Sequence, residues 1–444
     1  MTRTTLGSTI DGRVLEPGDP GYDGARTVWN AMIDRTPRYV VQCAGAGDVA
    51  DAVRFARAHD LDLGIRCGGH GIVGHAVPDD GLMIDLRPMG AVAVDPASRR
   101  ARVQGGALLG ALDRAAQAHG LATTAGNVSH TGVGGLTLGG GMGWLAREHG
   151  LTCDNVVSFE MVTADGEVVH TSAEERPDLF WALRGGGGNF GVVTDFEFAL
   201  HPETGHAIAA EFHFAAAEAG VPMRRWRDLS GAAPRRATFT VTIVGQVVAL
   251  GLVWVGDPAE GDAIISALRD ELARDAEPVQ ETIIPMTYLE LQTREDDEKG
   301  HAWRRYWKGH YFSALGDEAI DALLTREGPD LPNVSLQAYG GAIADVPDAD
   351  TAFARRDTAF EFVAASRWSD PAEDEARMSA ARRYAAALDD YASGAYVNVL
   401  GDDGAAGLRR AYTEHKLARL TAVKDRYDPG NAFHLNQNIR PSRG

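Results

Sequence analysis

Glycine is concentrated in three short clusters of this 444-residue chain, and no other feature restricts its fold as strongly. The clusters lie at residues 68–71, 126–143 and 185–191, and the second alone contains eight glycines. Backbone N–H groups can approach an anion closely only where no Cβ stands in the way, and positive φ angles are easily adopted only by glycine. One Gly-Gly pair usually marks a simple turn, but three clusters together favour binding of a phosphate or a dinucleotide.

The third cluster matches the dinucleotide-binding fingerprint G-x-G-x-x-G between Gly186 and Gly191. A Rossmann domain needs a strand before these glycines and a helix after them, so that the pyrophosphate meets the helix N-terminus. Here the order is reversed, because a helix-like segment begins at Leu179 and a strand-like run begins at Val192. The sequence therefore argues against a Rossmann domain.

The pattern of the chain changes near residues 205 and 393. Before residue 205, glycine-rich turns separate strands and helices, and Asp165-Gly166 between two β-like runs predicts a hairpin. From 205 to 393 glycine is sparse, and strand-like runs alternate with charged helices. The last segment, 394–444, is too short to fold alone, so we expect it to pack against the first unit. These features predict an α+β fold of two domains, the second a mixed or antiparallel sheet covered by helices.

Composition narrows the class of partner. A formal charge of -19 and a pI near 5.1 argue against binding nucleic acid or an anionic membrane, which both need basic patches. The start of the chain is not apolar and no run of about 18 apolar residues occurs, so we expect a cytoplasmic protein with a small-molecule partner and no membrane span. Cys43, Cys67 and Cys153 lack C-x-x-C spacing and are expected to be reduced thiols. No histidine or acidic spacing predicts a metal site.

Five motifs together make the sequence specific. The first is the turn Arg66-Cys-Gly-Gly-His70-Gly, in which an imidazole follows a strand and a glycine pair; alone, His70 would more often be a core histidine. The others are Thr131 to Gly143, Gly150-Leu-Thr-Cys-Asp-Asn-Val, Phe190-Gly-Val-Val-Thr and Asn436-Gln-Asn-Ile. In order and approximate spacing they resemble the berberine bridge enzyme-like oxidases of the vanillyl-alcohol oxidase flavoprotein superfamily. The resemblance is strongest over residues 39–200 and 395–440.

The resemblance implies a bipartite FAD-binding domain, residues 1–204 and 394–444, and an inserted substrate-binding domain, residues 205–393, whose sheet roofs the isoalloxazine. It implies that His70 bonds covalently to the flavin 8α-methyl group. Some relatives add a second bond through a cysteine at the place of Val128, so we predict a single covalent link and a packing role for Cys153. The residues implied in FAD binding are His70, Arg66, Cys67, Gly68, Gly69, Gly71, Gly126, Thr131, Gly132, Gly135, Gly139, Gly140, Gly191, Val193, Asn436 and Asn438. Cys67 replaces the serine of the family turn.

Candidates for the chemistry come from two further matches to the family. Tyr396-Val-Asn398 matches a strand near the flavin, where period-2 alternation would put both side chains on one face. Tyr396 is the first candidate for the base or proton relay, a role that needs its pKa lowered from about 10; a core tyrosine is the alternative. Gln337 and Tyr339 share a face of a substrate-domain strand, where Gln337 can only orient a ligand and Tyr339 is either catalytic or part of the core.

The function implied is that of an FAD-dependent oxidase, in which a small alcohol, amine or phenolic substrate passes a hydride to covalently bound FAD and O2 accepts the electrons. Two alternatives stay open. One is a dehydrogenase that uses the same flavin with another acceptor, and the other is a flavin-binding protein without catalytic activity.

Overall fold

The computed structural model describes residues 6–274, 276–297 and 300–443, which form three main β-sheets, a short two-stranded sheet and the helices that cover them. The predicted α+β class is confirmed. None of the described helices has both the length and the apolar character needed to cross a bilayer.

The first sheet has the order β1-β2-β4-β3, with β2, β4 and β3 parallel and β1 antiparallel at the edge. Its strands are β1 (Arg13–Leu15), β2 (Tyr39–Gln42), β3 (Leu63–Arg66) and β4 (Leu82–Asp85), and its helices are α2 (Tyr22–Arg26) and α3 (Ala46–Ala58). The short apolar strands are buried, as parallel strands covered by helices usually are. The first glycine cluster follows β3 directly.

The second sheet is antiparallel, with the order β5-β6-β10-β8-β9. Its strands are β5 (Val92–Asp95), β6 (Arg100–Gln104), β8 (Val156–Val162), β9 (Val168–Ser172) and β10 (Val192–Ala199). The hairpin predicted at Asp165-Gly166 joins β8 to β9. Packed around this sheet are α4 (Leu109–Gln117), α5 (Val133–Leu138), α6 (Ala146–His149), α7 (Pro177–Leu183) and the small pair β7 (Leu121–Ala122) and β11 (His201–Pro202). The third cluster links α7 to β10, the reverse of a Rossmann order.

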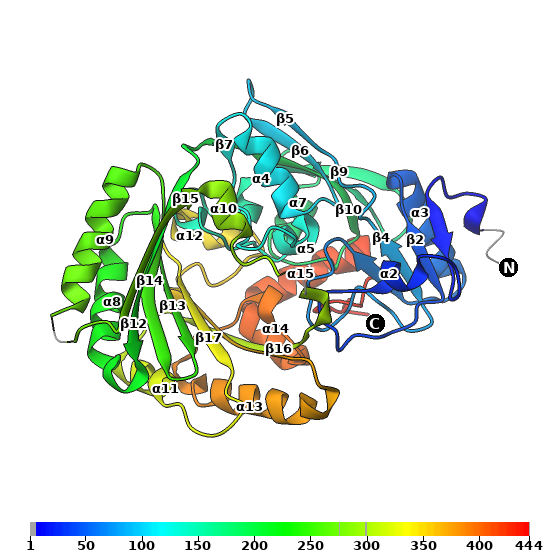
Figure 1. Cartoon of the computed structure of the whole chain (residues 1–444). Coiled ribbons are helices and arrows are strands. Elements are labelled where there is room, and N and C mark those ends of the chain that lie inside the picture. Colours follow the sequence, from blue (N-terminus) through cyan, green and yellow to red (C-terminus); the bar gives the residue numbers. More distant parts are fainter. Residues whose placement is uncertain (1–5, 275, 298–299, 444) are drawn as a thin grey trace.

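The third sheet is antiparallel and seven-stranded, with the order β15-β12-β14-β13-β17-β18-β16. Its strands are β12 (His206–Ala215), β13 (Ala237–Val244), β14 (Val247–Val255), β15 (Gln280–Thr287), β16 (Arg304–Phe312), β17 (Asn333–Ala338) and β18 (Phe360–Trp368). The helices of this region are α8 (Gly220–Ala232), α9 (Pro258–Leu272), α10 (Tyr288–Thr293), α11 (Asp317–Leu324), α12 (Ala342–Asp345) and α13 (Asp374–Ala386). In Figure 1 the sheet, green to yellow, separates α8 and α9 from the blue, cyan and red parts of the chain.

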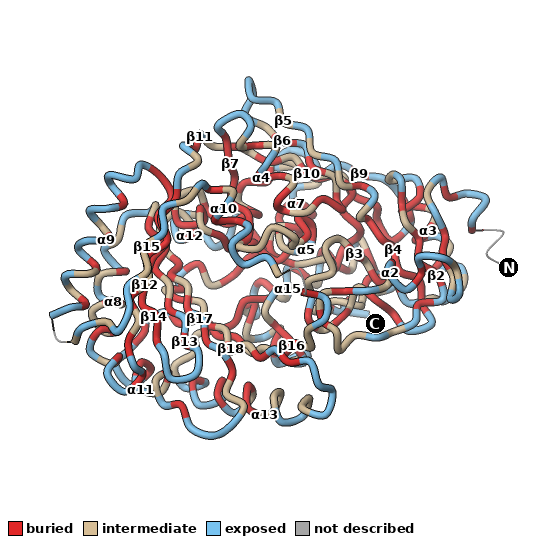
Figure 2. The backbone as a smooth tube through the Cα atoms, in the orientation of Figure 1, coloured by how far each residue is buried: buried red, intermediate tan, exposed pale blue. Residues whose placement is uncertain are grey.

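Strand β18 shows how one face of this sheet packs in a core while the other stays available for a ligand. Successive side chains of a strand point to opposite faces. Phe360 and Phe362 therefore enter the core beneath the outer helices, while Glu361 and Val363 point to the opposite face. Figure 2 shows the same two-sided character along α8 and α9, where buried and exposed positions alternate. One face of the sheet is thus left for a ligand.

The C-terminal segment returns to the first unit. It contains two helices, α14 (Gly404–Ala411) and α15 (Glu414–Tyr427), which are separate because Tyr412 leaves the helical conformation and the Thr413 hydroxyl caps α15. Lys424 of α15 is fully buried and donates hydrogen bonds to the carbonyl oxygen of Asn189 at 2.7 Å and to the Asp428 carboxylate at 2.7 Å. A buried ion pair of this kind fixes the returning segment against the third glycine cluster.

Two buried polar contacts join the seven-stranded region to the first unit. Arg356 donates two hydrogen bonds of 2.7 Å to the Asp154 carboxylate, and both side chains are buried. Gln292 of α10 donates to the Asp113 carboxylate of α4 at 3.0 Å and to the carbonyl oxygen of Gly126 at 2.9 Å. The second contact ties α10 to the start of the longest glycine cluster.

Asp113 makes this second contact sensitive to pH. Burial raises the pKa of its carboxyl from 3.8 to about 7. Since the native state then binds the proton more tightly than the unfolded chain, stability falls as the pH rises from about 4 through 7. With each pKa unit equal to about 1.4 kcal/mol, the loss approaches about 4 kcal/mol by pH 8.

We therefore expect Asp113→Asn to stabilise the protein at pH 8 by a few kcal/mol, because the amide oxygen still accepts from Gln292 and no charge is buried. The difference from wild type shrinks towards zero near pH 4. Urea unfolding followed by circular dichroism at both pH values measures it. Asp270→Asn, on the exposed side of α9, is the matched control and leaves stability nearly unchanged at both. If the difference in stability between Asp113→Asn and wild type were the same at pH 4 and at pH 8, the raised pKa of Asp113 would be refuted.

Candidate functional site

A cavity of about 670 Å³ lies where the three glycine clusters, the open face of the seven-stranded sheet and the C-terminal segment meet. Its walls combine apolar side chains with a small number of polar groups, which is typical of cofactor and substrate sites. The wall includes residues from 63–76, 126–142, 186–193, 396–400 and 433–437, together with Trp29, Trp307, Ser335, Gln337, Glu361, Val363 and Ala365.

Glycines form the floor of the cavity for two different reasons. At Gly68 and Gly132 two segments of the backbone touch, and a Cβ on either residue would overlap the backbone of the other. At Gly71, Gly135 and Gly188 no protein atom lies within 4 Å of where a Cβ would stand, so a side chain there would occupy the cavity itself. The first pair makes the floor possible, and the other three keep it open to a ligand.

Cys67, which replaces the family serine, keeps a side-chain contact. Its thiol donates to the carbonyl oxygen of Ala107 at 3.5 Å, and backbone N–H groups of Gly68, Gly134 and Gly135 surround the sulfur. Burial raises the pKa of this thiol to about 11, so it remains protonated near neutral pH. The cysteine therefore holds the first and second clusters together.

His70 projects into the cavity beside this floor. Its ring stacks on Trp29 with centroids 4.6 Å apart, and its Nε2 lies 2.6 Å from Nδ1 of His130. The Thr131 hydroxyl lies 3.3 Å from Nδ1 of His70. Burial lowers the pKa of His70 to about 3, so the imidazole is neutral at physiological pH. A neutral ring has one nitrogen lone pair available as a nucleophile.

Across the cavity, the open face of the sheet carries Glu361. Its carboxylate accepts a hydrogen bond of 2.6 Å from the Tyr339 hydroxyl. Burial raises the pKa of Glu361 from 4.5 to about 7. No Lys or Arg lines the cavity among the described residues, so this carboxyl has no permanent cationic partner there. Such a group can exchange a proton near neutral pH.

An amide pair lies beside Glu361. Gln337 is directly opposite Glu361 in the pairing of β17 with β18, and its Oε1 accepts from the Asn127 side chain at 3.1 Å. Gln337 Nε2 and Asn127 Oδ1 are buried and have no hydrogen-bond partner in the described part of the chain. One unused donor and one unused acceptor therefore line the wall together.

The segment Tyr396 to Asn398 does not form the predicted strand. It lies at a 3₁₀ turn, Val397–Val399, because Tyr396 and Asn398 bond to the floor and no neighbouring strand pairs with them. The Tyr396 hydroxyl accepts from the Gly141 amide at 2.7 Å and from the Asn398 amide at 2.8 Å. Both side chains still line the cavity. Burial raises the pKa of Tyr396, whereas the predicted role as a base needs it lowered.

Most residues predicted from the sequence line this one cavity. Those on its wall are His70, Cys67, Gly68, Gly69, Gly71, Gly126, Thr131, Gly132, Gly135, Gly191, Val193, Asn436, Gln337, Tyr396 and Asn398. Five others are not among the wall residues: Arg66, Gly139, Gly140, Asn438 and Tyr339. Their positions have separate physical reasons.

Neighbouring side chains of β3 point to opposite faces, and Ile65 lines the cavity. The Arg66 side chain therefore points away from the cavity, where it donates to the carbonyl oxygen of Ala25. A Cβ at Gly139 would overlap the Asn398 side chain, and a Cβ at Gly140 would overlap the Phe353 ring and touch Tyr396. Tyr339 is 1% exposed and lies behind Glu361. These residues support the wall from outside it.

Asn438 also lies off the wall, although its Oδ1 is buried without a hydrogen-bond partner among the described residues. Cys153 is fully buried, is not a wall residue and packs in the core of the first unit. Val128, at the place of a second attachment in some relatives, does line the cavity and carries no thiol.

Three of the wall residues that were not predicted from the sequence matter for the chemistry of the site. Glu361 has a recognisable signal, a single acid between Phe360 and Phe362 in an alternating strand. Asn127 follows the glycine at 126 but lies in no motif, and Trp307 has no local signal. Only the pairing of β16, β17 and β18 brings Trp307 and Glu361 to the same face as Gln337.

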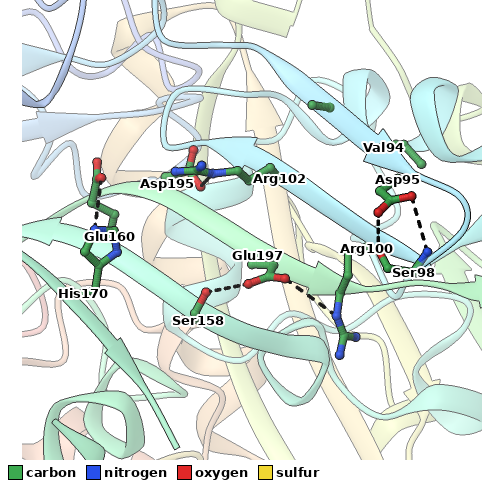
Figure 3. Close-up of a pocket in the computed structure, with 11 residues that line it drawn as sticks. Val94, Asp95, Ser98, Arg100, Arg102, Ser158, Glu160, His170, Asp195 and Glu197 are labelled. Carbon is green, nitrogen blue, oxygen red and sulfur yellow. Dashed lines mark hydrogen bonds and ion pairs between the residues drawn. The ribbon is translucent and has the colours of Figure 1, made fainter. Parts of the chain in front are cut away.

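A second hollow, of about 540 Å³, opens on the outer face of the five-stranded sheet. Figure 3 shows its charged side chains pairing with one another rather than converging on a point. Arg102 bonds Asp195 at 2.9 Å, and Ser158 bonds Glu197 at 2.9 Å. This surface is a solvated, self-paired face and has no feature of a catalytic site.

Comparison with known proteins agrees with the geometry. An FAD binding domain model matches residues 37–172, and a berberine and berberine-like model matches residues 395–440. An FAD-linked oxidoreductase of Dictyostelium discoideum is 30% identical over 441 residues, 98% of this chain and 95% of that protein. (R)-6-hydroxynicotine oxidase of Paenarthrobacter nicotinovorans is 42% identical over 193 residues, 44% of this chain and 42% of that protein.

Among solved structures, 6-hydroxy-D-nicotine oxidase from Arthrobacter nicotinovorans superposes with a TM-score of 0.86 at 28% identity, covering 100% of both chains. The fold and the matched domain define an FAD-dependent oxidoreductase. The chain belongs to the berberine bridge enzyme-like family of FAD-linked oxidoreductases, which confirms the resemblance found in the motifs.

The open floor predicts how one glycine substitution acts. Gly135→Val adds a side chain that meets no protein atom but enters the cavity, so the protein folds while FAD affinity falls by about tenfold or more. Titration of apoprotein, produced under riboflavin limitation, with FAD measures this. Gly47→Val, on an exposed and equally open position of α3, is the matched control and leaves FAD affinity unchanged. If the two variants bound FAD with equal affinity, the glycine floor would not be the FAD-binding surface.

Proposed function

We propose that the protein is an oxidase that carries FAD on one covalent bond from His70, oxidises a small organic substrate at a carbon next to nitrogen or oxygen, and passes the electrons to O2. The observation that carries the proposal is the position of Glu361, a half-buried carboxyl with a pKa near 7, on the wall of the cavity that also holds the glycine floor and His70. The matched sequence and the matched solved structure both carry names that include oxidase, which supports oxygen as the acceptor.

The residues that each domain contributes to the cavity wall indicate which domain binds FAD and which binds the substrate. We assign residues 1–204 and 394–444 to FAD binding, because they supply the glycine floor, His70 and the returning segment. We assign residues 205–393 to substrate binding, because their sheet supplies Gln337 and Glu361 on the opposite wall. The substrate would lie between the two.

The residues present fit FAD. The floor leaves space at Gly71, Gly135 and Gly188 where a Cβ would stand, and backbone amides at such places can approach a pyrophosphate. Asn436 lies on the same wall with an unused Oδ1. When bound, the flavin supplies the hydride acceptor. All proton transfers then fall to side chains of this chain.

Glu361 is the best candidate for the group that takes the substrate proton. A general base works best with a pKa near the working pH, and burial brings Glu361 there. Tyr339 donates to one of its carboxylate oxygens, which orients the group and leaves the other oxygen for the substrate. Tyr339 is thus assigned a positioning role.

Tyr396 is assigned a different role from the base first considered. Its oxygen already accepts two hydrogen bonds, and its own proton has no acceptor within the described residues. Since burial keeps it protonated, it can donate that proton as a hydrogen bond to a bound molecule. Asn398 fixes the hydroxyl, and the free amide atoms of Gln337 and Asn127 orient a polar substrate group.

The covalent link is tested by acid precipitation. Wild type is expected to keep its yellow flavin in the acid pellet, on the peptide that contains His70, with fragment masses placing the flavin on the histidine rather than on Cys67, and on no peptide that contains Cys153. His70→Ala is expected to bind FAD that acid releases, since the floor remains. Absorbance and peptide mass mapping measure both. Free flavin from wild type would remove the covalent assignment.

The base is tested by substitution. Glu361→Gln keeps the size and the bond from Tyr339 but cannot accept a proton, so we expect anaerobic flavin reduction by substrate to slow by about 10²- to 10⁴-fold. Tyr396→Phe removes the hydroxyl with its hydrogen bonds but leaves the proposed base in place, and should slow flavin reduction by about tenfold. Stopped-flow absorbance measures the rates, with Glu318→Gln on the surface of α11 as control. If Glu361→Gln reduced its flavin at a rate within threefold of wild type, Glu361 would not be the base.

Oxygen as acceptor has its own test. The reduced protein, mixed with air-saturated buffer, should regain its oxidised spectrum within seconds and release H2O2. Reoxidation over many minutes would instead identify a dehydrogenase that uses another acceptor.

A further inference from the structure

A line of three polar side chains runs from the cavity to the surface. His70 Nε2 lies 2.6 Å from His130 Nδ1, and His130 Nε2 lies 3.9 Å from Asp296 Oδ1. Asp296 is itself held by Ser129, whose amide and hydroxyl donate to the two carboxylate oxygens at 3.1 and 2.6 Å. His70 and His130 belong to the first unit, whereas Asp296 belongs to the inserted region.

The order of donors and acceptors along this line follows from the carboxylate. Asp296, when ionised, can only accept, so it favours a proton on the facing Nε2 of His130. A neutral His130 then offers Nδ1 as an acceptor, and the close neighbour, Nε2 of His70, must be the donor. His70 is left with its lone pair on Nδ1.

The surroundings keep both imidazoles neutral. Burial lowers the pKa of His70 and of His130, and His301 and Arg305 lower both further, while Asp296 and Asp297 oppose this change at His130 without reversing it. Arg305 lies 3.8 Å over the ring of Trp29, on which His70 stacks. The stacking fixes the plane of the His70 ring, and the Thr131 hydroxyl, 3.3 Å from Nδ1, marks the side to which that lone pair points.

We propose that Asp296, His130 and His70 form a proton relay that prepares His70 for covalent attachment of the flavin, with the bond formed at Nδ1. The inference rests on the proposed link between FAD and His70. As Nδ1 bonds to carbon, Nε2 releases its proton to His130, and Asp296 stabilises the imidazolium that results. His130 and Asp296 are positioning residues for attachment, with no part in substrate oxidation.

The net reaction balances. One C–H bond of the flavin 8α-methyl group and one N–H bond of His70 break, and one C–N bond forms. Two electrons and two protons are released, and O2 takes them up as H2O2. The relay supplies the path for the proton that leaves His70, and oxygen in solution is the oxidant.

The relay also couples attachment to assembly of the two domains. Ser129 lies in the second glycine cluster, and its bonds to Asp296 exist only when the inserted region lies against that cluster. His130, the next residue, meets Asp296 by the same contact. Attachment is therefore fast only after the two parts of the chain have docked.

The test follows attachment rather than turnover. Full-length protein made under riboflavin limitation is mixed with FAD, and acid-stable flavin is measured against time in air. We expect His130→Ala to bind FAD, seen as quenching of flavin fluorescence, but to attach it about a hundredfold more slowly than wild type. Added imidazole should restore much of the rate, which a merely structural defect would not allow.

Asp296→Asn should slow attachment by about tenfold. Two controls at exposed positions outside the cavity wall, Asp270→Asn and His119→Ala, should attach flavin at the wild-type rate. Peptide NMR should place the bond on Nδ1. Wild-type rates in His130→Ala, or a bond on Nε2, would overturn the relay. Wild type that never retains flavin in acid would instead refute the link to His70, a failure of the proposed function itself.

Discussion

The cavity depends on the contact between the backbones at Gly68 and Gly132. The turn after β3 and the start of α5 approach so closely there that a Cβ on either residue would overlap the other chain. Cys67 strengthens the contact, because backbone amides from both segments surround its sulfur. Without this approach the first and second glycine clusters would be separate turns, and neither would form one floor beneath a ligand.

The opposite wall follows from a simpler rule, the alternation of side chains along a strand. In β18 the same nine residues fill an apolar core on one side and present Glu361 and Val363 on the other. Because the helices shield one face completely, the other is free to carry polar groups without loss of the core. Burial of that second face against the first unit is what raises the pKa of Glu361 to about 7.

Contacts between the two domains therefore do more than hold the chain together. Arg356 with Asp154, and Gln292 with Asp113, fix the sheet over the floor. Ser129 with Asp296 does the same at the edge near His70. Each of these contacts places a charge in a partly dry environment, where its strength and its protonation are coupled.

The sequence by itself determined the fold class and the family, and it predicted that the glycine clusters and His70 lie at one site, because these depend on local motifs whose chemistry is carried by neighbouring residues. It failed where side chains distant in the chain meet. Tyr396 and Asn398 follow a 3₁₀ turn since their partners are Gly141 and Leu136 rather than another strand. Glu361, Asn127 and the relay through His130 were decided only by the tertiary structure, since burial, strand pairing and domain contact set their protonation and neighbours, and no local pattern encodes those quantities.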